Sequence, residues 1–308
     1  MAAARRTIAA MTSPIQVRRF LHCNYNCRDV DSLERFYAET FEMKPVMRSQ
    51  SDGSDGTPFG IYQTTLSKTS FLYDHRGGRR ANALELVQWI EPATIGTVYP
   101  NGWDRGIQSV AFSVSDLEAT AARAVARGAS VVRQGDGWML LRDPEGVAVE
   151  VIEADGQPEA RYLRVVCSDL DRTIAWWTQL GFVENPTLVA RSGQAIWPGD
   201  GERSISAERA IVGTDDPTFG VVFTSWSGPP PVGPTYGVPY HQGIYRMAVA
   251  VEDVQASYES LLTMGVARQP PYTFQLPGTP LTNGLTILFI RDPDGILVEL
   301  VGRPRQPQ

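Results

Sequence analysis

The chain has 308 residues, of which 43% are hydrophobic and 20% charged, and its formal net charge is −6. This length and composition are typical of a soluble globular protein with two ordinary domains. The net charge is negative and there is no basic stripe, which argues against nucleic acid or an anionic membrane as the main partner. We therefore expect a small-molecule partner, bound by a monomer or a homodimer.

No apolar run approaches the roughly 18 residues that a transmembrane helix needs. The three cysteines are an odd number in a long chain, so they do not suggest a disulfide framework. A reducing cytoplasm is the expected setting.

Two segments are expected to lack regular structure. Residues 1–15 contain two arginines, many alanines and no acidic residue, and we expect a disordered leader there. Residues 48–60 read RSQSDGSDGTPFG, a run of small and polar residues that predicts a long flexible loop.

The rest of the chain repeats one pattern four times: an alternating strand, an acidic turn and an amphipathic helix. Acidic side chains in the turn can cap the helix that follows. The acidic turns hold Asp29, Asp116, Asp169 and Asp253. The residues seven positions before them are His22, Ser109, Tyr162 and Arg246.

The ends of the repeats match in pairs. RDPEGVAVEV from Arg142 and RDPDGILVEL from Arg291 each predict a tight turn and then a strand with one glutamate, Glu150 or Glu299. ALELVQWIEPATIG from residue 83 matches GVVFTSWSGPPPVG from residue 220 and sets Val222 opposite Glu85. Residues 16–155 and 160–304 are therefore two copies of one unit, and each copy contains two modules.

This arrangement resembles the vicinal oxygen chelate superfamily, which includes glyoxalases, bleomycin-resistance proteins and extradiol dioxygenases. The resemblance implies an α+β fold in which four βαβββ modules pair into two tandem glyoxalase-like domains. We expect an N-terminal domain at 16–155 with a metal site and a C-terminal domain at 156–308 without metal ligands.

Strand alternation assigns the side chains of the first strand to two faces, because residues two apart point the same way. The matching positions in the other three modules are apolar on one face, which predicts that this face packs under the helix. The packed face carries Cys23, Tyr25 and Cys27, and the cavity face carries His22, Asn24 and Asn26.

The family's ligand positions lie on the first and last strands of each module, which the resemblance carries onto His22, Glu85, Ser109 and Glu150 in the first half. We expect His22, Glu85 and Glu150 to hold a divalent ion, Mn, Ni, Co, Fe or Zn, because this donor set suits hard or borderline metals. Many relatives carry a second histidine where this chain has Ser109. The residues expected to contact substrate are Asn24, Asn26, Ser109 and Trp89.

The second half has Tyr162, Val222, Arg246 and Glu299 at the same positions. We do not expect this set of residues to bind a metal. Arg246 and Glu299 are expected to pair across the cavity, and the alternative is that Arg246 receives a substrate carboxylate.

The pairing of the modules stays open at this point. Pairing of adjacent modules is preferred by analogy and brings Glu150 to His22. Pairing of the first module with the fourth would instead bring together His22, Glu85, Arg246 and Glu299.

The function that the resemblance implies is a metal-dependent isomerase, epimerase or lyase of the glyoxalase type. In such enzymes the metal stabilises an enolate of a small oxygenated metabolite and a glutamate moves the proton, here Glu85 or Glu150. One alternative is a ring-cleaving, extradiol-type dioxygenase, and another is a non-catalytic protein that sequesters a small molecule.

Overall fold

The computed structural model describes residues 15–188, 193–230, 236–274 and 284–303, so the expected leader at 1–15 lies almost wholly outside the described residues. Each module contains a strand, a helix and three further strands. The first module contains β1 (Val17–Cys27), α1 (Val30–Phe41), β2 (Lys44–Asp55), a 3-10 turn (Thr57–Phe59), β3 (Thr64–Tyr73) and β4 (Ala83–Glu91). The second contains β5 (Gly106–Val114), α2 (Leu117–Ala126), β6 (Ser130–Gly135), β7 (Trp138–Arg142) and β8 (Ala148–Glu153).

The second half follows the same order with one short extra helix. The third module contains β9 (Glu159–Val166), α3 (Leu170–Gln179), β10 (Val183–Glu184), α4 (Gly193–Ile196), β11 (Ser204–Val212) and β12 (Gly220–Ser227). The fourth contains β13 (Gly243–Val251), α5 (Val254–Thr263), β14 (Tyr272–Phe274), β15 (Leu285–Arg291) and β16 (Leu297–Gly302). None of the helices in the described residues is long and apolar enough to cross a membrane.

The acidic turns cap the four long helices as the sequence predicts. Each turn aspartate is extended in its backbone, and its carboxylate accepts a hydrogen bond from the backbone N–H three residues later. The capping residues are Asp29, Asp116, Asp169 and Asp253. This local rule explains why all four modules start a helix at the same point.

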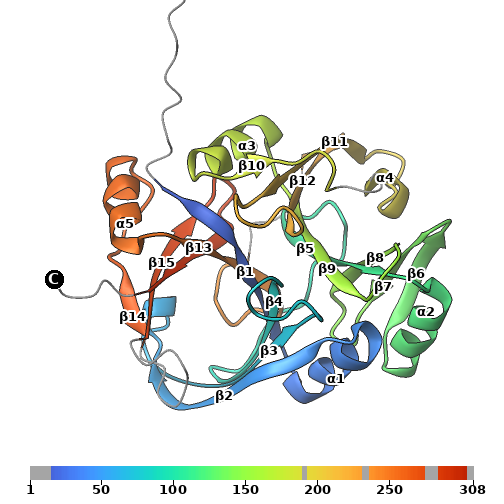
Figure 1. Ribbon diagram of the computed structural model, residues 1–308, viewed down its shortest axis with the longest axis horizontal. Helices are drawn as coiled ribbons and strands as arrows, with labels where there is room; N and C mark the ends of the chain where they lie inside the picture. The colour runs from blue at the N-terminus through green and yellow to red at the C-terminus, as the bar shows by residue number, and fades with distance from the viewer. Residues whose placement is uncertain (1–14, 189–192, 231–235, 275–283, 304–308) are drawn as a thin grey trace, which may run out of the picture.

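The strands form two curled sheets of eight strands each. Sheet one has the order β14-β15-β16-β13-β1-β4-β3-β2, and sheet two has the order β10-β11-β12-β9-β5-β8-β7-β6. Figure 1 shows sheet one curling through the left half of the molecule and sheet two through the right half. Each sheet is therefore built by two modules.

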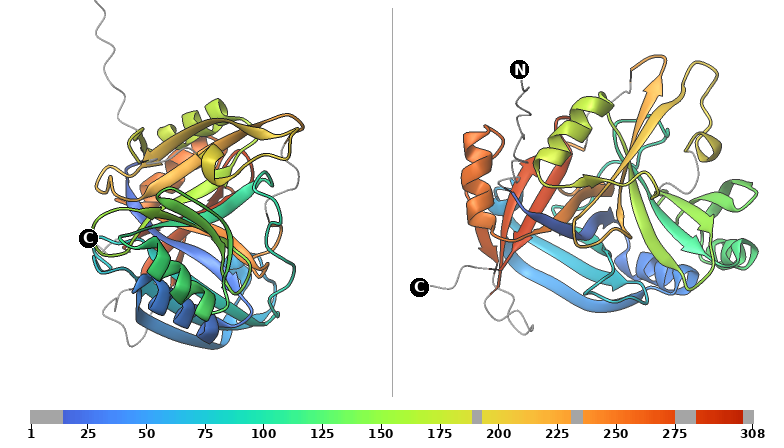
Figure 2. Two further views of the ribbon diagram at one scale, coloured as in Figure 1. Left: turned by 90° about the vertical axis from the view of Figure 1, so that its right-hand side faces the viewer. Right: turned by 45° about the horizontal axis from the view of Figure 1, so that its top comes forward.

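The module pairing differs from the one we preferred. At the centre of sheet one β1 lies antiparallel to β13, and at the centre of sheet two β5 lies antiparallel to β9. The first module thus pairs with the fourth and the second with the third. The short link at 154–158 keeps the chain within sheet two, whereas the longer links at 92–105 and 228–242 carry it between the sheets (Figures 1 and 2).

The main core lies where the helices cover the sheets and the two sheets meet. Helices α1 and α2 pack side by side, and Phe41 of α1 stacks on Phe112 of β5 with ring centroids 4.2 Å apart. Cys23 and Cys27 lie in this core as the strand alternation predicts, and burial raises the pKa of both thiols. These cysteines are buried packing residues and not metal ligands.

The prediction of a flexible loop at 48–60 is wrong for most of this segment. Strand β2 continues to Asp55 because it pairs with β3 as far as Thr64, and this pairing outweighs the low strand propensity of its serine, glycine and aspartate residues. The 3-10 turn that follows directs Phe59 and Ile61 into an apolar cluster.

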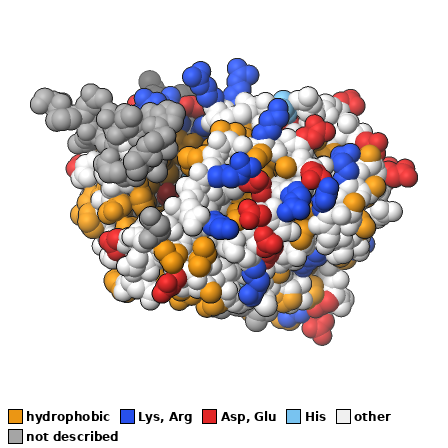
Figure 3. Space-filling model, turned by 90° about the horizontal axis from the view of Figure 1, so that it is seen from below, with side chains coloured by type: hydrophobic (Ala, Val, Ile, Leu, Met, Phe, Trp, Pro, Cys, Tyr) orange, Lys and Arg blue, Asp and Glu red, His pale blue; other side chains and the backbone are white. Residues whose placement is uncertain are grey.

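The surface seen in Figure 3 mixes charges of both signs. Basic and acidic side chains alternate over this face, and hydrophobic side chains gather mainly at one end of it.

Candidate functional site

Four side chains from adjacent strands of sheet one converge on its concave face. We call His22 of β1, Glu85 of β4, Arg246 of β13 and Glu299 of β16 quartet one. The strands lie in the order β16-β13-β1-β4, and Asn24 of β1 is in register with both Glu85 and Arg246. Module pairing therefore decides which residues share a site.

Arg246 is the centre of quartet one. Its Nε donates to Glu299 Oε2 at 2.8 Å and its Nη2 donates to Glu85 Oε2 at 3.0 Å. The expected pairing of Arg246 with Glu299 is therefore present, and Glu85 is a second partner. His22 Nε2 lies 3.4 Å from Glu85 Oε2 and 3.6 Å from Glu299 Oε2, which are long polar contacts and not good hydrogen bonds.

Glu85, Arg246 and Glu299 are buried and His22 is partly buried, and the charges of quartet one depend on one another. Burial alone would lower the pKa of Arg246, but Glu85 and Glu299 raise it above its usual value. Burial would likewise raise the pKa of Glu299, yet Arg246 and His22 lower it to about 2. Glu299 is therefore an ionised partner of Arg246 at neutral pH.

Two aromatic rings lie against the guanidinium of Arg246. Its Cζ lies 5.5 Å from the ring centroid of Phe59 and 5.9 Å from that of Phe289, within the range of cation–π attraction. On the other side of the quartet, His22 meets Phe71 edge to face at 5.4 Å. The polar cluster therefore has apolar walls that limit contact with water.

The two asparagines of β1 differ in their surroundings. Asn26 donates to the carbonyl oxygens of Pro239 and His241 and accepts from Trp89 Nε1, so it ties this segment to β1. We call the concave side of each sheet its cup. Asn24 is fully buried, and neither its amide nitrogen nor its oxygen has a hydrogen-bond partner among the described residues. A buried amide without partners is costly, so Asn24 is a candidate for contact with a ligand.

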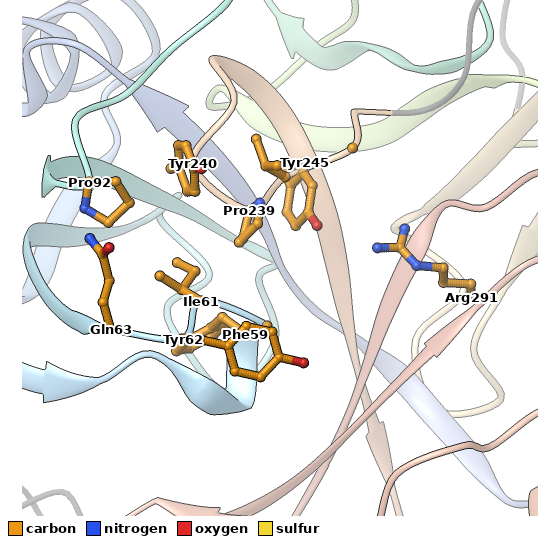
Figure 4. Close-up of a pocket in the computed structure, with 12 residues that line it drawn as sticks. Phe59, Ile61, Tyr62, Gln63, Pro92, Pro239, Tyr240, Tyr245 and Arg291 are labelled. Atoms are coloured by element: carbon orange, nitrogen blue, oxygen red, sulfur yellow. The ribbon is translucent and has the colours of Figure 1, made fainter.

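A cavity of about 460 Å³ is reached from quartet one through Phe59 and Tyr245, and no side chain of the quartet itself lines it (Figure 4). Its wall includes Phe59, which also contacts Arg246, and Tyr245, the neighbour of Arg246 in the chain. In Figure 4, Arg291 faces this aromatic wall across the opening. The other lining residues are Gly60, Ile61, Tyr62, Gln63, Pro92, Gly237, Val238, Pro239 and Tyr240.

Sequence reasoning missed most of this wall. Phe59 and Tyr62 follow a run of glycine, serine and aspartate that reads as a loop, and Tyr240 and Tyr245 flank a link between modules. The aromatic residues in these two polar, glycine-rich segments were the only available signal. Trp89 was expected to contact substrate. It is buried, and its ring packs against that of Phe59 with the two centroids 6.1 Å apart.

Glu150 does not join His22 and Glu85, so the predicted set of three metal ligands does not form one site. Glu150 lies on β8 of sheet two, beside β5 and on the same concave face as Ser109 and Tyr162. We call Ser109, Glu150, Tyr162 and Val222 quartet two, because they occupy the matching positions of sheet two. The preferred pairing failed because β9, and not β1, lies against β5.

Glu150 is fully buried and accepts hydrogen bonds from every direction. Arg164 donates through Nε at 2.6 Å and Nη2 at 3.0 Å, Tyr162 Oη donates at 2.7 Å and Trp197 Nε1 at 2.9 Å, and the Ser109 hydroxyl completes the set. Burial opposes ionisation, but Arg164 outweighs it and holds the pKa of Glu150 below its usual value. This carboxylate has no free lone pair to offer a metal or a substrate.

The residues of quartet one fit a divalent metal only in part. One imidazole and two carboxylates are suitable donors. The fourth position, however, holds a guanidinium that already binds both carboxylates. Among the described residues, no three histidine, cysteine or acidic side chains are placed as a metal site. With Arg246 in this position the quartet does not fit a metal ion.

Comparison with known proteins places the chain in a family. The model of the Glyoxalase/Bleomycin resistance protein/Dioxygenase superfamily matches residues 19–151 and again residues 160–300. The chain belongs to this superfamily. The two matches follow the two halves of the sequence, whereas each sheet of this superfamily member combines strands from both halves.

Solved structures agree with the superfamily fold over nearly the whole chain. Glyoxalase I from Zea mays is 20% identical, with 92% of each chain covered and a TM-score of 0.60, and a mutant of the same enzyme gives 18% identity, 92% and 94% coverage and a TM-score of 0.62. A putative dioxygenase from Bacillus subtilis is 12% identical, with 94% of this chain and 86% of the other covered and a TM-score of 0.61. At these identities the likeness concerns the fold. A search of curated proteins finds no match.

Proposed function

We propose that the cup of sheet one binds a small oxygenated molecule and moves a proton on it, as an isomerase, epimerase or lyase of the glyoxalase type. The observation that carries the proposal is the meeting of two carboxylates and one imidazole in quartet one, with Phe59 between Arg246 and a cavity of about 460 Å³. Proton transfer next to a carbonyl requires a positioned base and a group that stabilises the enolate oxygen.

Glu85 is the base in this proposal. A carboxylate with a pKa of about 2, as in Glu299, is a weak base because it holds a proton poorly. Among the described residues Glu85 accepts hydrogen bonds only from Arg246 Nη2, so the carboxylate has unused lone pairs for a substrate proton. Glu299 then serves to fix the guanidinium of Arg246.

Arg246 and Asn24 are the groups for the substrate oxygens. Arg246 Nη1 donates to no described residue, and the Asn24 amide has no partner in the described part of the chain. Both carry N–H donors, which suit a carbonyl or enolate oxygen. No step of this proposal uses the divalent ion that the family resemblance implies.

The experiment follows the exchange of substrate C–H hydrogens with solvent deuterium, by proton NMR, over a panel of α-hydroxy ketones and 2-oxo acids. Exchange of at least one compound should fall about 100-fold or more in Glu85→Gln, the size expected when a general base is lost. The control is Glu118→Gln, at an exposed position on α2, which should leave the rate unchanged. Exchange that persists in Glu85→Gln would remove Glu85 as the base.

A second function is the non-catalytic binding of a small molecule. The observation that favours it is that Arg246 already neutralises much of the charge on the two carboxylates. A compound that binds in the cup and shows no exchange with the wild type would support this function over the first.

A further inference from the structure

We infer that Arg246 takes the place of the metal ion in this cup, so that the site works with a permanent guanidinium and excludes a divalent ion. The inference concerns the cup of the proposed function, but it does not require that the cup be catalytic. It rests on the position, charge and packing of one side chain.

The position of Arg246 follows from the module pairing. Arg246 lies seven residues before the acidic turn of the fourth module, at the same place that His22 holds in the first module. Since β13 lies between β1 and β16, the guanidinium reaches the carboxylates of Glu85 and Glu299 from the centre of the sheet. A metal bound by these carboxylates and His22 would need the same space.

The charge of Arg246 cannot be removed to make room. A guanidinium stays protonated in proteins and has no lone pair to donate, so it can neither lose its proton nor become a ligand. A divalent ion beside it would put like charges a few ångströms apart in a buried site, where Coulomb repulsion is weakly screened. The guanidinium of Arg246 therefore balances the charge of the Glu85 and Glu299 carboxylates in place of a metal ion.

The packing of Arg246 opposes rotation out of the site. The side chain is buried, the rings of Phe59 and Phe289 both lie against its guanidinium, and it makes hydrogen bonds to two carboxylates. Rotation outward would leave Glu85 and Glu299 buried without a cation. An uncompensated buried charge is strongly destabilising. The closed arrangement is therefore the stable one.

Quartet two shows the same solution in the same protein. There Arg164 binds Glu150 through two nitrogens, and a metal-free buried carboxylate is fully satisfied. In both sheets a glutamate on the last strand of a module therefore pairs with an arginine two strands away, Glu85 with Arg246 across β1 and Glu150 with Arg164 across β5.

The test is a metal titration that does not depend on turnover. Wild type and Arg246→His are stripped with a chelator, checked by circular dichroism and titrated calorimetrically with Ni²⁺, Co²⁺, Zn²⁺ and Mn²⁺, with elemental analysis after dialysis. The wild type should hold no stoichiometric ion. Arg246→His, with a fourth ligand in place of the cation, should bind one ion per chain with about 10- to 100-fold higher affinity, the range for a single group that supports a metal site.

A matched control places the new ion in the cup. His22→Ala in the Arg246→His background should lose the gained affinity, whereas an ion on the surface would stay bound. If Arg246→His does not fold, Arg246→Gln replaces it in the same comparison, since its amide also removes the charge.

Two results would overturn the inference. The first is one tightly bound ion in the wild type that is lost in Glu299→Gln. The second is a correctly folded Arg246 variant that binds no better than the wild type, because the guanidinium would then not be what excludes the metal. Absence of deuterium exchange with the wild type, when the metal results are as expected, would count only against the proposed function.

Discussion

Quartet one and quartet two occupy the same strand positions in two sheets built from the same repeated module, yet their surroundings differ. In quartet one His22 makes only long polar contacts and the neighbouring Asn24 has no partner in the described residues, and a cavity lies alongside. In quartet two Glu150 is saturated with donors and Trp197 lies against it.

The difference comes from what covers each cup. In sheet two, helix α4 leads directly into Trp197, whose indole packs in a cluster with Trp138, Ile205 and Trp226. The backbone of Gly102 leaves room for this indole, because a Cβ there would come within 2.2 Å of the ring. The protein's own tryptophan thus lies against the buried carboxylate of sheet two.

The largest effect is expected from Glu150→Ala, which tests whether quartet two is structural. It leaves Arg164 buried without its main partner, and we expect the free energy of unfolding to fall by about 3–5 kcal/mol. Urea denaturation measures the loss, and Glu150→Gln, which keeps the shape and part of the hydrogen bonding, should lose less. A fall below about 1 kcal/mol, the size of one ordinary hydrogen bond, would contradict the structural role.

Trp197→Ala should open the cup of sheet two and make it resemble that of sheet one. Loss of a buried tryptophan typically costs about 3–5 kcal/mol, and we expect about 3 kcal/mol because a short helix can partly refill the space. Binding of a fluorescent apolar dye should appear together with the loss of stability. Trp103→Ala, at the partly buried edge of the same cluster, is the control and should not create dye binding.

The matching turns after β7 and β15 predict how stability depends on pH. Burial raises the pKa of Asp143 and of Asp292 to about 7, well above the value of about 3.9 in an unfolded chain. The folded protein therefore holds these protons more tightly, and stability should fall as the pH rises from about 4 to 7, by up to about 1.4 kcal/mol per pH unit for each group.

Asp143→Asn checks this pH dependence, because it removes one titrating group while keeping an oxygen for Tyr25 and Tyr37, whose hydroxyls donate to the carboxylate. Thermal unfolding between pH 5 and 8 should show a shallower slope in the variant. An unchanged slope would mean that Asp143 is already ionised in the folded protein at pH 5. The pKa of Glu299 is lowered instead of raised, so its effect on stability has the opposite sign. Its ionised carboxylate stabilises the folded protein, and this stabilisation is lost only as the pH falls from about 4.5 towards 2.

Ser109→Ala should have the smallest effect. It removes one of several donors to Glu150 and leaves the pairing with Arg164 intact. We expect a loss of about 1 kcal/mol in the free energy of unfolding, the usual net value of one hydrogen bond. A loss as large as that of Glu150→Ala would show that the donors to Glu150 act as one unit.

Much of the site was predictable from local patterns in the sequence. Alternation along the first strand placed His22 on the cavity face and Cys23 on the packed face, because a strand's side chains change sides at every residue. The acidic turns identified the start of each helix for the same local reason. These features need only a few neighbouring residues.

The partners of those residues were not predictable in the same way. Glu150 and Glu299 lie in nearly identical motifs, and no local signal says which one faces His22. The choice depends on which central strands meet, β1 with β13 or with β5, and this is set by where the links at 92–105 and 228–242 carry the chain. Local periodicity is enough to identify the module, its two faces and the four strand positions. The place of Arg246 beside His22 and Glu85 follows from contacts between distant strands, and these contacts have no counterpart in local periodicity.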